Sequence, residues 1–348
     1  MATVSNISQR DVARAAGVAR STISKALRDD PTIPAARCAE IKRIAKKLGY
    51  SPNPMISALM AKLHHQRRRS DPCHIGWIDL WPTGQGPATV PILAPLLQGA
   101  RQRARELGFD IEVHRVVAKG IRPERLRQML TARSQWGLII PPVPQSTMSF
   151  PLDMRGLTGV TIGTSLHAPT MHRVSPNHYQ GAQLACDQLR ARGCRRIGLA
   201  LSRTMDERVE GKWLGAYAAR QFLWPEKDRA RPLLFDVAAG VDPAGKPISG
   251  ADEAAFRTWI RRERLDGLLL AEPTVAAWAV KARDVLSPSC VAWLVLEPKQ
   301  TNVRGIDYRA EQIGAAAVEL VVGQIHRNER GNPAAPHTVL LDGVWEER

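Results

Sequence analysis

The sequence predicts an all-α helix-turn-helix head in front of an α/β body, whose two doubly wound parallel-sheet lobes enclose a ligand cleft. Three observations lead to this fold class. Short helical segments joined by a glycine-containing turn occupy the first fifty residues. From Cys73 onward, short apolar runs alternate with helical stretches, which is typical of βαβ units. Residues 1–70 contain 14 Lys and Arg against 4 Asp and Glu, so positive charge is concentrated at the N-terminal end.

The 348 residues are enough for a small domain and a two-lobed body. We expect a helix-turn-helix DNA-binding domain over residues 1–50, a hinge helix and linker over 51–72, and the body over 73–348. The first lobe of the body is expected to cover about 73–174 and 300–324. The second lobe is expected to cover about 175–299 and 325–348.

Three short helices are expected in the head. Ser8 opens a capping-box pattern ahead of the first helix, and Gly17 ends that helix because glycine adopts a left-handed conformation at low cost. The second helix covers Arg20–Leu27, and the third runs from about Pro34 to Leu48. A helix-turn-helix unit with a basic excess indicates a double-stranded DNA partner, whose phosphates the cations neutralise.

Strands and helices alternate along the body. Strands are expected at His74–Trp81, Asp110–Val117, Trp136–Pro141, Gly159–Gly163, Arg195–Leu201, Leu265–Leu270 and Val291–Leu296. Helices are expected at Ile92–Leu107, Pro123–Arg133, Tyr179–Arg192 and about Asp206–Phe222. The first of these helices has an arginine-rich outer face. Two successive α/β halves predict a ligand site outside the carboxyl ends of the strands.

Several other classes of protein do not fit the sequence. No apolar run is long enough for a secretion signal or a membrane span, and five scattered cysteines fit reduced thiols, so we expect a cytoplasmic protein. The spacing at Gly240–Lys246 is that of a phosphate loop, but Pro247 stands where a Ser or Thr is needed. No hydrolase or metalloprotease motif is present, so neither catalysis nor a cofactor is expected. His64 and His65 fit a solvated linker better than a metal site.

Two segments together carry a family resemblance. RDVARAAGVARSTISKALRDDPTIP (10–34) and KKLGYSPNPMISALMAKL (46–63) resemble the head and hinge of the LacI/GalR family of repressors. The body resembles, more loosely, the family's periplasmic-binding-protein-like domain, which binds an effector and dimerises. That likeness rests on Tyr179–Ile197, Ile313–Ala316 and Glu346–Arg348. The resemblance implies a transcription regulator, a repressor, that binds a palindromic operator as a homodimer.

The resemblance also implies which residues contact DNA: Arg20, Ser21, Thr22, Lys25, Asn53 and Leu59. Base readout is favoured over phosphate contact for Arg20, and both remain open for Lys25. Leu59 in the hinge helix is expected to wedge between base pairs, although it could instead cover the body. Ala19 departs from the family's usual Ser and cannot cap the recognition helix.

For the effector, the candidate residues are Asp79, Trp81, Asn177, Arg208, Lys212 and Glu272. Lys212 stands where the family usually has an Arg, with Arg208 one turn earlier, and Asn177 and Glu272 lie in segments that also depart from the pattern. Nine tryptophans favour a carbohydrate, because their rings stack on sugars, although any one of them could be a core residue. A purine-type or other ligand remains open, as does a body that binds nothing and only dimerises.

Overall fold

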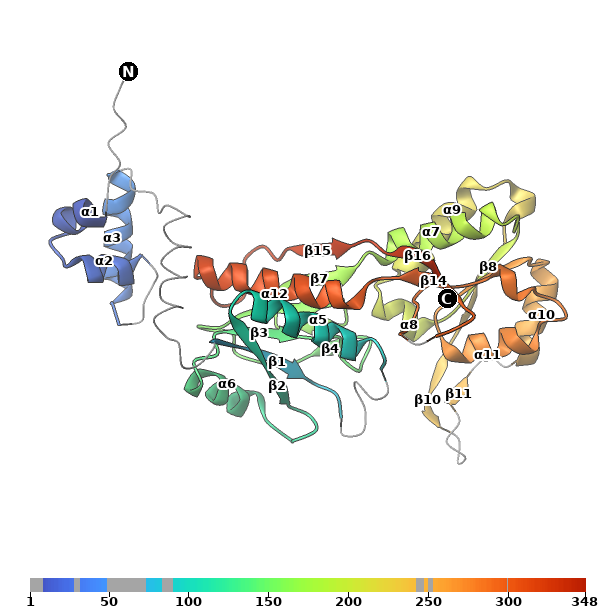
Figure 1. Cartoon of the computed structure of the whole chain (residues 1–348), viewed down its shortest axis with the longest axis horizontal. Coiled ribbons are helices and arrows are strands. Elements are labelled where there is room, and N and C mark those ends of the chain that lie inside the picture. Colours follow the sequence, from blue (N-terminus) through green and yellow to red (C-terminus); the bar gives the residue numbers. More distant parts are fainter. Residues whose placement is uncertain are drawn as a thin grey trace, which may run out of the picture. The chain divides into compact units, whose positions relative to one another are not determined.

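The computed structural model describes residues 9–27, 32–48, 73–82, 90–241, 247–249, 253–298 and 300–348 (Figure 1). These residues fall into two compact units, and the division along the chain lies between Asp71 and Pro72. The first unit contains the head and the second contains the body.

The head consists of three helices, α1 (Gln9–Ala16), α2 (Arg20–Ala26) and α3 (Ala35–Lys47). All three agree with the sequence prediction to within a few residues. They pack around a small core in which Val12, Ile23 and Ile41 are fully buried. Each of the three helices therefore contributes apolar side chains to one shared core.

The first sheet of the body has six strands in the order β15-β7-β5-β3-β1-β2, and every neighbouring pair is parallel. Its strands are β1 (Cys73–Asp79), β2 (Phe109–Arg115), β3 (Gly137–Ile140), β5 (Thr158–Ile162), β7 (His172–Pro176) and β15 (Thr338–Leu341). Helices α5 (Leu93–Glu106) and α12 (Ala310–Arg327) belong to the core that contains Trp77. Helix α6 (Pro123–Ala132) packs with Ile78 of the same strand. Because successive strand residues point to opposite faces, the sheet is covered by helices on both faces.

The second sheet has the order β16-β14-β13-β12-β8-β9 and is parallel except for β16, which runs antiparallel to β14. Its strands are β8 (Ile197–Ser202), β9 (Leu233–Phe235), β12 (Gly267–Leu270), β13 (Val291–Trp293), β14 (Arg304–Asp307) and β16 (Val344–Glu347). Helices α7 (His178–Ala191) and α9 (Lys212–Leu223) share a core with Leu269. Helices α10 (Glu253–Glu263) and α11 (Pro273–Lys281) share another with Leu268. The two doubly wound lobes predicted from the sequence are confirmed.

Shorter elements complete the body. They are helix α8 (Arg203–Arg208), the 3₁₀ turns η1 (Glu226–Asp228) and η2 (Pro288–Cys290), the strand pair β4 (Met148–Ser149) and β6 (Leu166–Ala168), and the ribbon β10 (Val237–Val241) with β11 (Pro247–Ser249). In the described ranges, no helix is both long enough and apolar enough to cross a membrane.

The structure corrects two expectations. The single helix expected over Asp206–Phe222 is wrong, because the chain breaks into α8 and α9 at Glu210 and Gly211, where φ is +56° and +69°. The expected ends of the lobes also differ, since β14 lies in the second sheet although it falls within 300–324. Likewise, β15 lies in the first sheet although it falls within 325–348. Strands of only four residues show no periodicity that would indicate which sheet they join.

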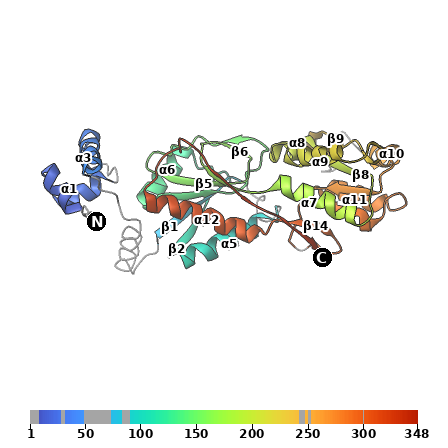
Figure 2. The same cartoon turned by 90° about the horizontal axis from the view of Figure 1, so that it is seen from above.

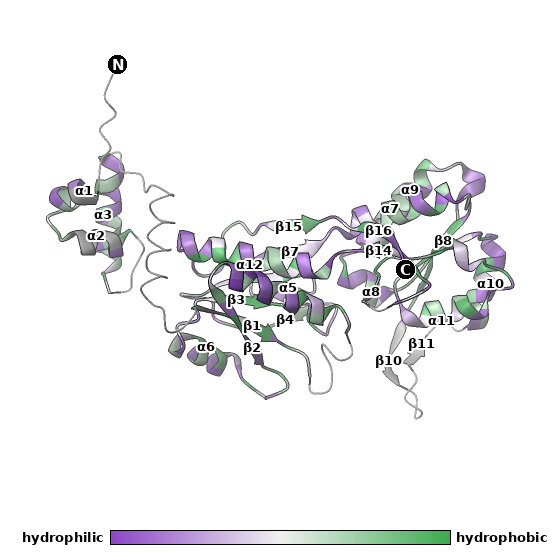
Figure 3. Ribbon diagram, viewed as in Figure 1, coloured by the Kyte–Doolittle hydropathy of each residue, from purple (hydrophilic) through white to green (hydrophobic). Residues whose placement is uncertain are grey.

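Helices α5 and α12 approach each other closely, and Figures 1 and 2 both show them side by side. A side chain at Gly99 would collide with the backbone carbonyl of Glu311, and one at Gly314 would collide with that of Leu96. Apolar and polar residues alternate around both helices (Figure 3). The contact with α12 therefore fixes the position of α5, which forms one wall of the pocket described below.

Candidate DNA-binding head and ligand pocket

Helix α2 is the candidate recognition helix of the head. Ile23 and Ala26 are buried, whereas Lys25 is exposed and its Nζ donates to Thr32 Oγ1 at 3.4 Å. Thr22 is half-buried. One side of the helix is thus held by the core, and the side chain of Lys25 is exposed to solvent.

The start of α2 has the weak cap expected from the sequence. Ala19 is the N-cap residue, and among the described residues no side chain caps the helix. Arg20 and Ser21 are the first two residues of α2, the end that a recognition helix turns toward base edges. The predicted hinge contacts Asn53 and Leu59 lie outside the described residues.

The third helix adds a basic surface to the head. The side chains of Lys42, Arg43, Lys46 and Lys47 are all exposed, while Ile41 and Ala45 of the same helix are buried. These cations can contact phosphates, and such contacts orient a protein on DNA without reading its sequence.

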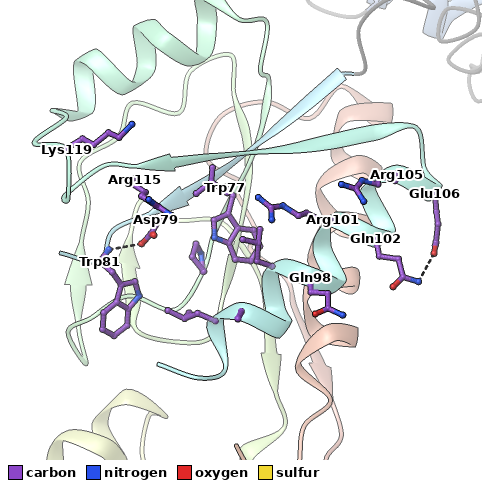
Figure 4. Close-up of a pocket in the computed structure, with 15 residues that line it drawn as sticks. Trp77, Asp79, Trp81, Gln98, Arg101, Gln102, Arg105, Glu106, Arg115 and Lys119 are labelled. Atoms are coloured by element: carbon purple, nitrogen blue, oxygen red, sulfur yellow. Dashed lines mark hydrogen bonds between the residues drawn. The ribbon is translucent and has the colours of Figure 1, made fainter. Parts of the chain in front are cut away.

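The first lobe contains a pocket of about 1090 Å³ between α5 and the strands β1 and β2 (Figure 4). Its lining residues are Trp77, Asp79, Trp81, Leu93, Ala94, Leu97, Gln98, Arg101, Gln102, Arg105, Glu106, Val113, Arg115, Lys119 and Pro141. The parallel register of β1 and β2 aligns Trp77 with Val113 and Asp79 with Arg115. Paired residues of parallel strands point to the same face, so the register itself brings an apolar and a charged pair into the pocket.

Asp79 and Trp81 both line this pocket, as two of the six predicted effector residues. Oδ1 of Asp79 accepts a hydrogen bond from the backbone N–H of Trp81 at 2.9 Å. The indole N–H of Trp81 donates to the carbonyl of Pro142 at 2.8 Å. Both side chains are therefore held in place by bonds within the protein, and the tryptophan ring remains half-buried.

The other four predicted effector residues do not line it. Asn177 caps helix α7 by accepting from the N–H of Gln180 at 3.3 Å, and its amide donates to Asp342 at 2.7 Å. Glu272 accepts from the backbone N–H of Ser202 at 2.7 Å and from its hydroxyl at 2.8 Å. Glu272 therefore joins the start of α11 to the end of β8, and Asn177 joins the start of α7 to the segment that follows β15.

Arg208 links the two lobes. Its guanidinium donates to the carbonyls of Val143, at 2.8 Å, and Pro144, both in the first lobe. In return, the hydroxyl of Thr164 donates to the Arg208 carbonyl at 2.6 Å. Burial lowers the pKa of Arg208 from its ordinary value. This arginine therefore acts as a bridge between the lobes.

Glu210 supports the same junction. It forms an ion pair with Arg173 of the first lobe at 3.3 Å and a second ion pair with the predicted effector residue Lys212. The ammonium group of Lys212 is thus paired with a carboxylate of the protein itself.

Sequence reasoning missed most of the pocket. The residues it missed include Trp77, Gln98, Arg101, Arg115 and Lys119. Two signals could have found them: the arginines on the outer face of the helix at 92–107, and the spacing of Trp77, Asp79 and Trp81, which puts three side chains on one face of a strand. Trp213, Trp278 and Trp293, by contrast, are buried core residues.

A buried polar cluster lies at the start of α7. The ring of His178 meets Trp213 edge-on at 5.0 Å and Tyr308 at 5.1 Å between centroids. His178 Nδ1, Trp213 Nε1 and the Tyr308 hydroxyl are buried and have no hydrogen-bond partner among the described residues. Burial, and to a lesser extent the charge of Lys212, lower the pKa of His178 to about 3. The histidine is therefore neutral at physiological pH.

The described residues contain no group of three or more His, Cys, Asp and Glu that could hold a metal ion.

Residues 8–53 match the family model of "Bacterial regulatory proteins, lacI family". None of the curated proteins matches the chain.

Solved structures share the fold of nearly the whole chain. The complex of a transcriptional regulator CelR with cellobiose is 21% identical, with a TM-score of 0.52, and the similarity covers 98% of this chain and 99% of that one. The lac repressor dimer bound to operator and the anti-inducer ONPF is 16% identical, with a TM-score of 0.50 and 98% of both chains covered. A LacI-family regulator from Rhizobium etli is 16% identical, with a TM-score of 0.57, covering 79% of this chain and 97% of that one.

The head matches that of DNA-binding regulatory proteins, and the body has the two-lobed α/β fold of solved structures of transcription regulators. The family match covers residues 8–53, and the likeness of the whole chain to these solved structures is a likeness of fold.

Proposed function

We propose that the protein is a cytoplasmic repressor that binds a palindromic operator as a homodimer and is controlled by a small-molecule effector, a carbohydrate or a carbohydrate derivative. The observation that carries the proposal is the combination of a LacI-type head, whose candidate recognition helix exposes Lys25, with a body that contains a ligand-sized pocket.

The contacts to DNA that we propose are those of Arg20, Ser21, Thr22 and Lys25 with bases or phosphates in the major groove. Asn53 and Leu59 would act in the minor groove. Support comes from the position of the first four on α2 and from the exposure of Lys25. A bidentate Arg contact to guanine contributes about 1–3 kcal/mol of discrimination, so Arg20 is expected to select a guanine in each half-site.

Effector control is supported by the construction of the body. A ligand shifts the equilibrium between two conformations of the protein only if it binds one of them more tightly than the other. The pocket lies in the first lobe, and the loop of Val143 and Pro144, which Arg208 holds from the second lobe, directly follows its lining residue Pro141. A ligand in the pocket could therefore change this junction. The relatives whose solved structures contain cellobiose or ONPF favour a sugar over other ligands.

The test is selection of random DNA duplexes by the full-length protein, followed by titration of the enriched site. A palindrome should be enriched, with an affinity about 10³-fold or more above that for unrelated DNA. Arg20→Ala and Lys25→Ala should weaken operator binding about tenfold, whereas Lys227→Ala, an exposed lysine of the second lobe, should leave it unchanged. Enrichment of no sequence, or equal loss in all three variants, would contradict the proposal.

A further inference from the structure

We propose that Cys194 and Cys290 of the second lobe form a reversible redox site, at which a peroxide joins the two thiols in a disulfide. The contacts proposed above for DNA and for the effector use neither cysteine, so the inference does not depend on them. Both cysteines are free thiols in the structure. They lie far apart in the sequence, but at the same end of one sheet, on either side of β12.

The strand register places the two cysteines around Gly267, the first residue of β12. Leu268 pairs with Val291 of β13, so the residues just before them, Gly267 and Cys290, are neighbours as well. Neighbouring residues of parallel strands point to the same face of the sheet. On its other side β12 pairs with β8, and Cys194 comes three residues before that strand.

The missing side chain of Gly267 makes room for a thiol. A Cβ atom at this position would lie 3.0 Å from the Cβ of Cys194 and 3.3 Å from its Sγ. The sulfur of Cys194 therefore lies where a side chain at Gly267 would be, on the face to which Cys290 also points. A larger residue at this position would separate the two thiols.

The packing of the second lobe brings the two thiols together in the same way. Cys194 is 3% exposed and belongs to the core that contains Leu269, and the half-buried Cys290 packs against that same core. Burial, and after it a hydrogen bond with the Cys290 thiol, raise the pKa of the Cys194 thiol to about 12. The two sulfur atoms are therefore neighbours.

The two thiols differ in their access to solvent, and this difference assigns their roles. Cys290 is half-buried, and its Sγ lies 3.8 Å from the hydroxyl of the exposed Ser289. Oxidation of a cysteine depends on its exposure and on its thiolate form. Cys194 is buried and protonated, so a peroxide reaches Cys290 first. Cys194 then acts as the resolving thiol.

The reaction takes place in two steps. The sulfur of Cys290 attacks one oxygen of hydrogen peroxide, the O–O bond breaks, and the thiol proton leaves with the other oxygen as water. The product is a sulfenic acid. The sulfur of Cys194 then attacks the sulfenic sulfur, the S–O bond breaks, and the proton of Cys194 leaves with the hydroxide as a second water. The two thiols supply the two electrons that reduce the peroxide, and a dithiol reductant reverses the disulfide.

The other three cysteines provide the contrast. Cys186 is fully buried, and burial is the main reason that its pKa is raised to about 12. Cys38 is buried in the core of the head, and Cys73 is exposed at the start of β1 in the first lobe. Disulfides in a reducing compartment are rare, and those that form are mostly transient redox sensors. The inference therefore concerns one pair among five cysteines.

The experiment treats the folded, full-length protein with hydrogen peroxide and stops the reaction with catalase. The remaining thiols are counted after unfolding, and peptide mapping by mass spectrometry identifies linked cysteines. The test variant is Cys290→Ser, and the matched control is Cys73→Ser, which removes an exposed thiol outside the pair. Cys194→Ala, with dimedone present, tests whether Cys290 forms a sulfenic acid. The wild type unfolded in urea before treatment shows which pairs form without the fold.

We expect the five thiols of the folded wild type to fall to three, with one peptide pair that links Cys194 to Cys290. Dithiothreitol should restore all five. Cys73→Ser should lose the same two thiols at the wild-type rate, whereas Cys290→Ser should lose thiols at least about tenfold more slowly. In Cys194→Ala, dimedone should label Cys290. Five persisting thiols, equal rates for Cys290→Ser and the wild type, or the same linked peptides in equal yield from the folded and the unfolded protein would each overturn the inference.

Discussion

Two regions of the body contain candidate ligand-binding charges, and they differ in how those charges are used. In the second lobe, Arg208, Lys212 and Glu272 are all bonded to other groups of the protein. In the first-lobe pocket, Arg101 and Arg115 have no such partner within the described residues. The residue type at a position therefore does not show whether its charge is available to a ligand. The surrounding hydrogen bonds decide that.

The cost of removing charges from water explains the difference. A buried charge is stable only when polar groups around it replace its hydration. Arg208 is withdrawn from water and is compensated by two carbonyls. The exposed pocket arginines remain hydrated and keep their charge for a partner from solution. Substitutions should therefore affect stability in the second lobe and ligand binding in the first.

The largest change in the free energy of unfolding is expected for Glu272→Ala. The substitution leaves the N–H and the hydroxyl of Ser202 without their carboxylate, and hydrogen bonds to charged groups contribute about 1.5–3 kcal/mol. The free energy of unfolding, measured in urea, should fall by about that amount. The control Glu226→Ala removes an exposed carboxylate of the same lobe and should change it by less than about 0.5 kcal/mol. Similar values for both would show that the bonded carboxylate is unimportant.

His178 should make the free energy of unfolding depend on pH, and this is the second largest effect. Its pKa is about 3 in the folded protein, against 6.5 in the unfolded chain. Below pH 6.5 the unfolded chain binds the extra proton, so stability present above that pH is lost as the pH falls toward 3. Between pH 7.5 and 5.0 the histidine should remove about 2 kcal/mol from the free energy of unfolding.

Comparison of His178→Leu with the wild type in urea at both pH values measures this contribution. The leucine variant should lose about 2 kcal/mol less on acidification, whereas His167→Leu, at an exposed position, should behave like the wild type. An unchanged pH dependence in His178→Leu would show that the buried ring is not the source.

The pattern of short apolar runs and helices predicted both sheets, because core strands such as β3 and β12 are continuously apolar and buried. The head was predicted closely because its helices are defined locally, by Gly17 and by the spacing of buried residues. The candidate site was predicted less well. Of the six predicted effector residues, only Asp79 and Trp81, at the end of the first predicted strand, line the pocket. The partners of Arg208 and Glu272 come from distant segments, and local patterns in one sequence do not show such contacts.

A third effect concerns the junction of the lobes. Arg208→Ala removes the bonds to Val143 and Pro144 and should destabilise the body by about 1–2 kcal/mol. The lobes should also separate, which small-angle scattering would detect as a larger radius of gyration. Lys212→Ala breaks only a partly exposed ion pair with Glu210, worth about 0.2–1 kcal/mol, and should leave the radius unchanged. If both variants expand equally, or neither does, Arg208 is not the bridge.

The smallest expected change in stability is an increase, whereas the other substitutions lower stability. Without a ligand, Arg101→Gln with Arg115→Gln relieves the repulsion between Arg101 and Arg105, so stability should stay the same or rise by about 0.2–0.5 kcal/mol. Added salt screens that repulsion, and wild-type stability should therefore gain more from salt than that of the variant. Arg103→Gln provides the contrast, because it removes ion pairs with Glu106 and Glu319 and should destabilise the protein. A loss of stability in the double variant would mean that the pocket arginines have partners of their own, and the distinction between the two regions would then fail.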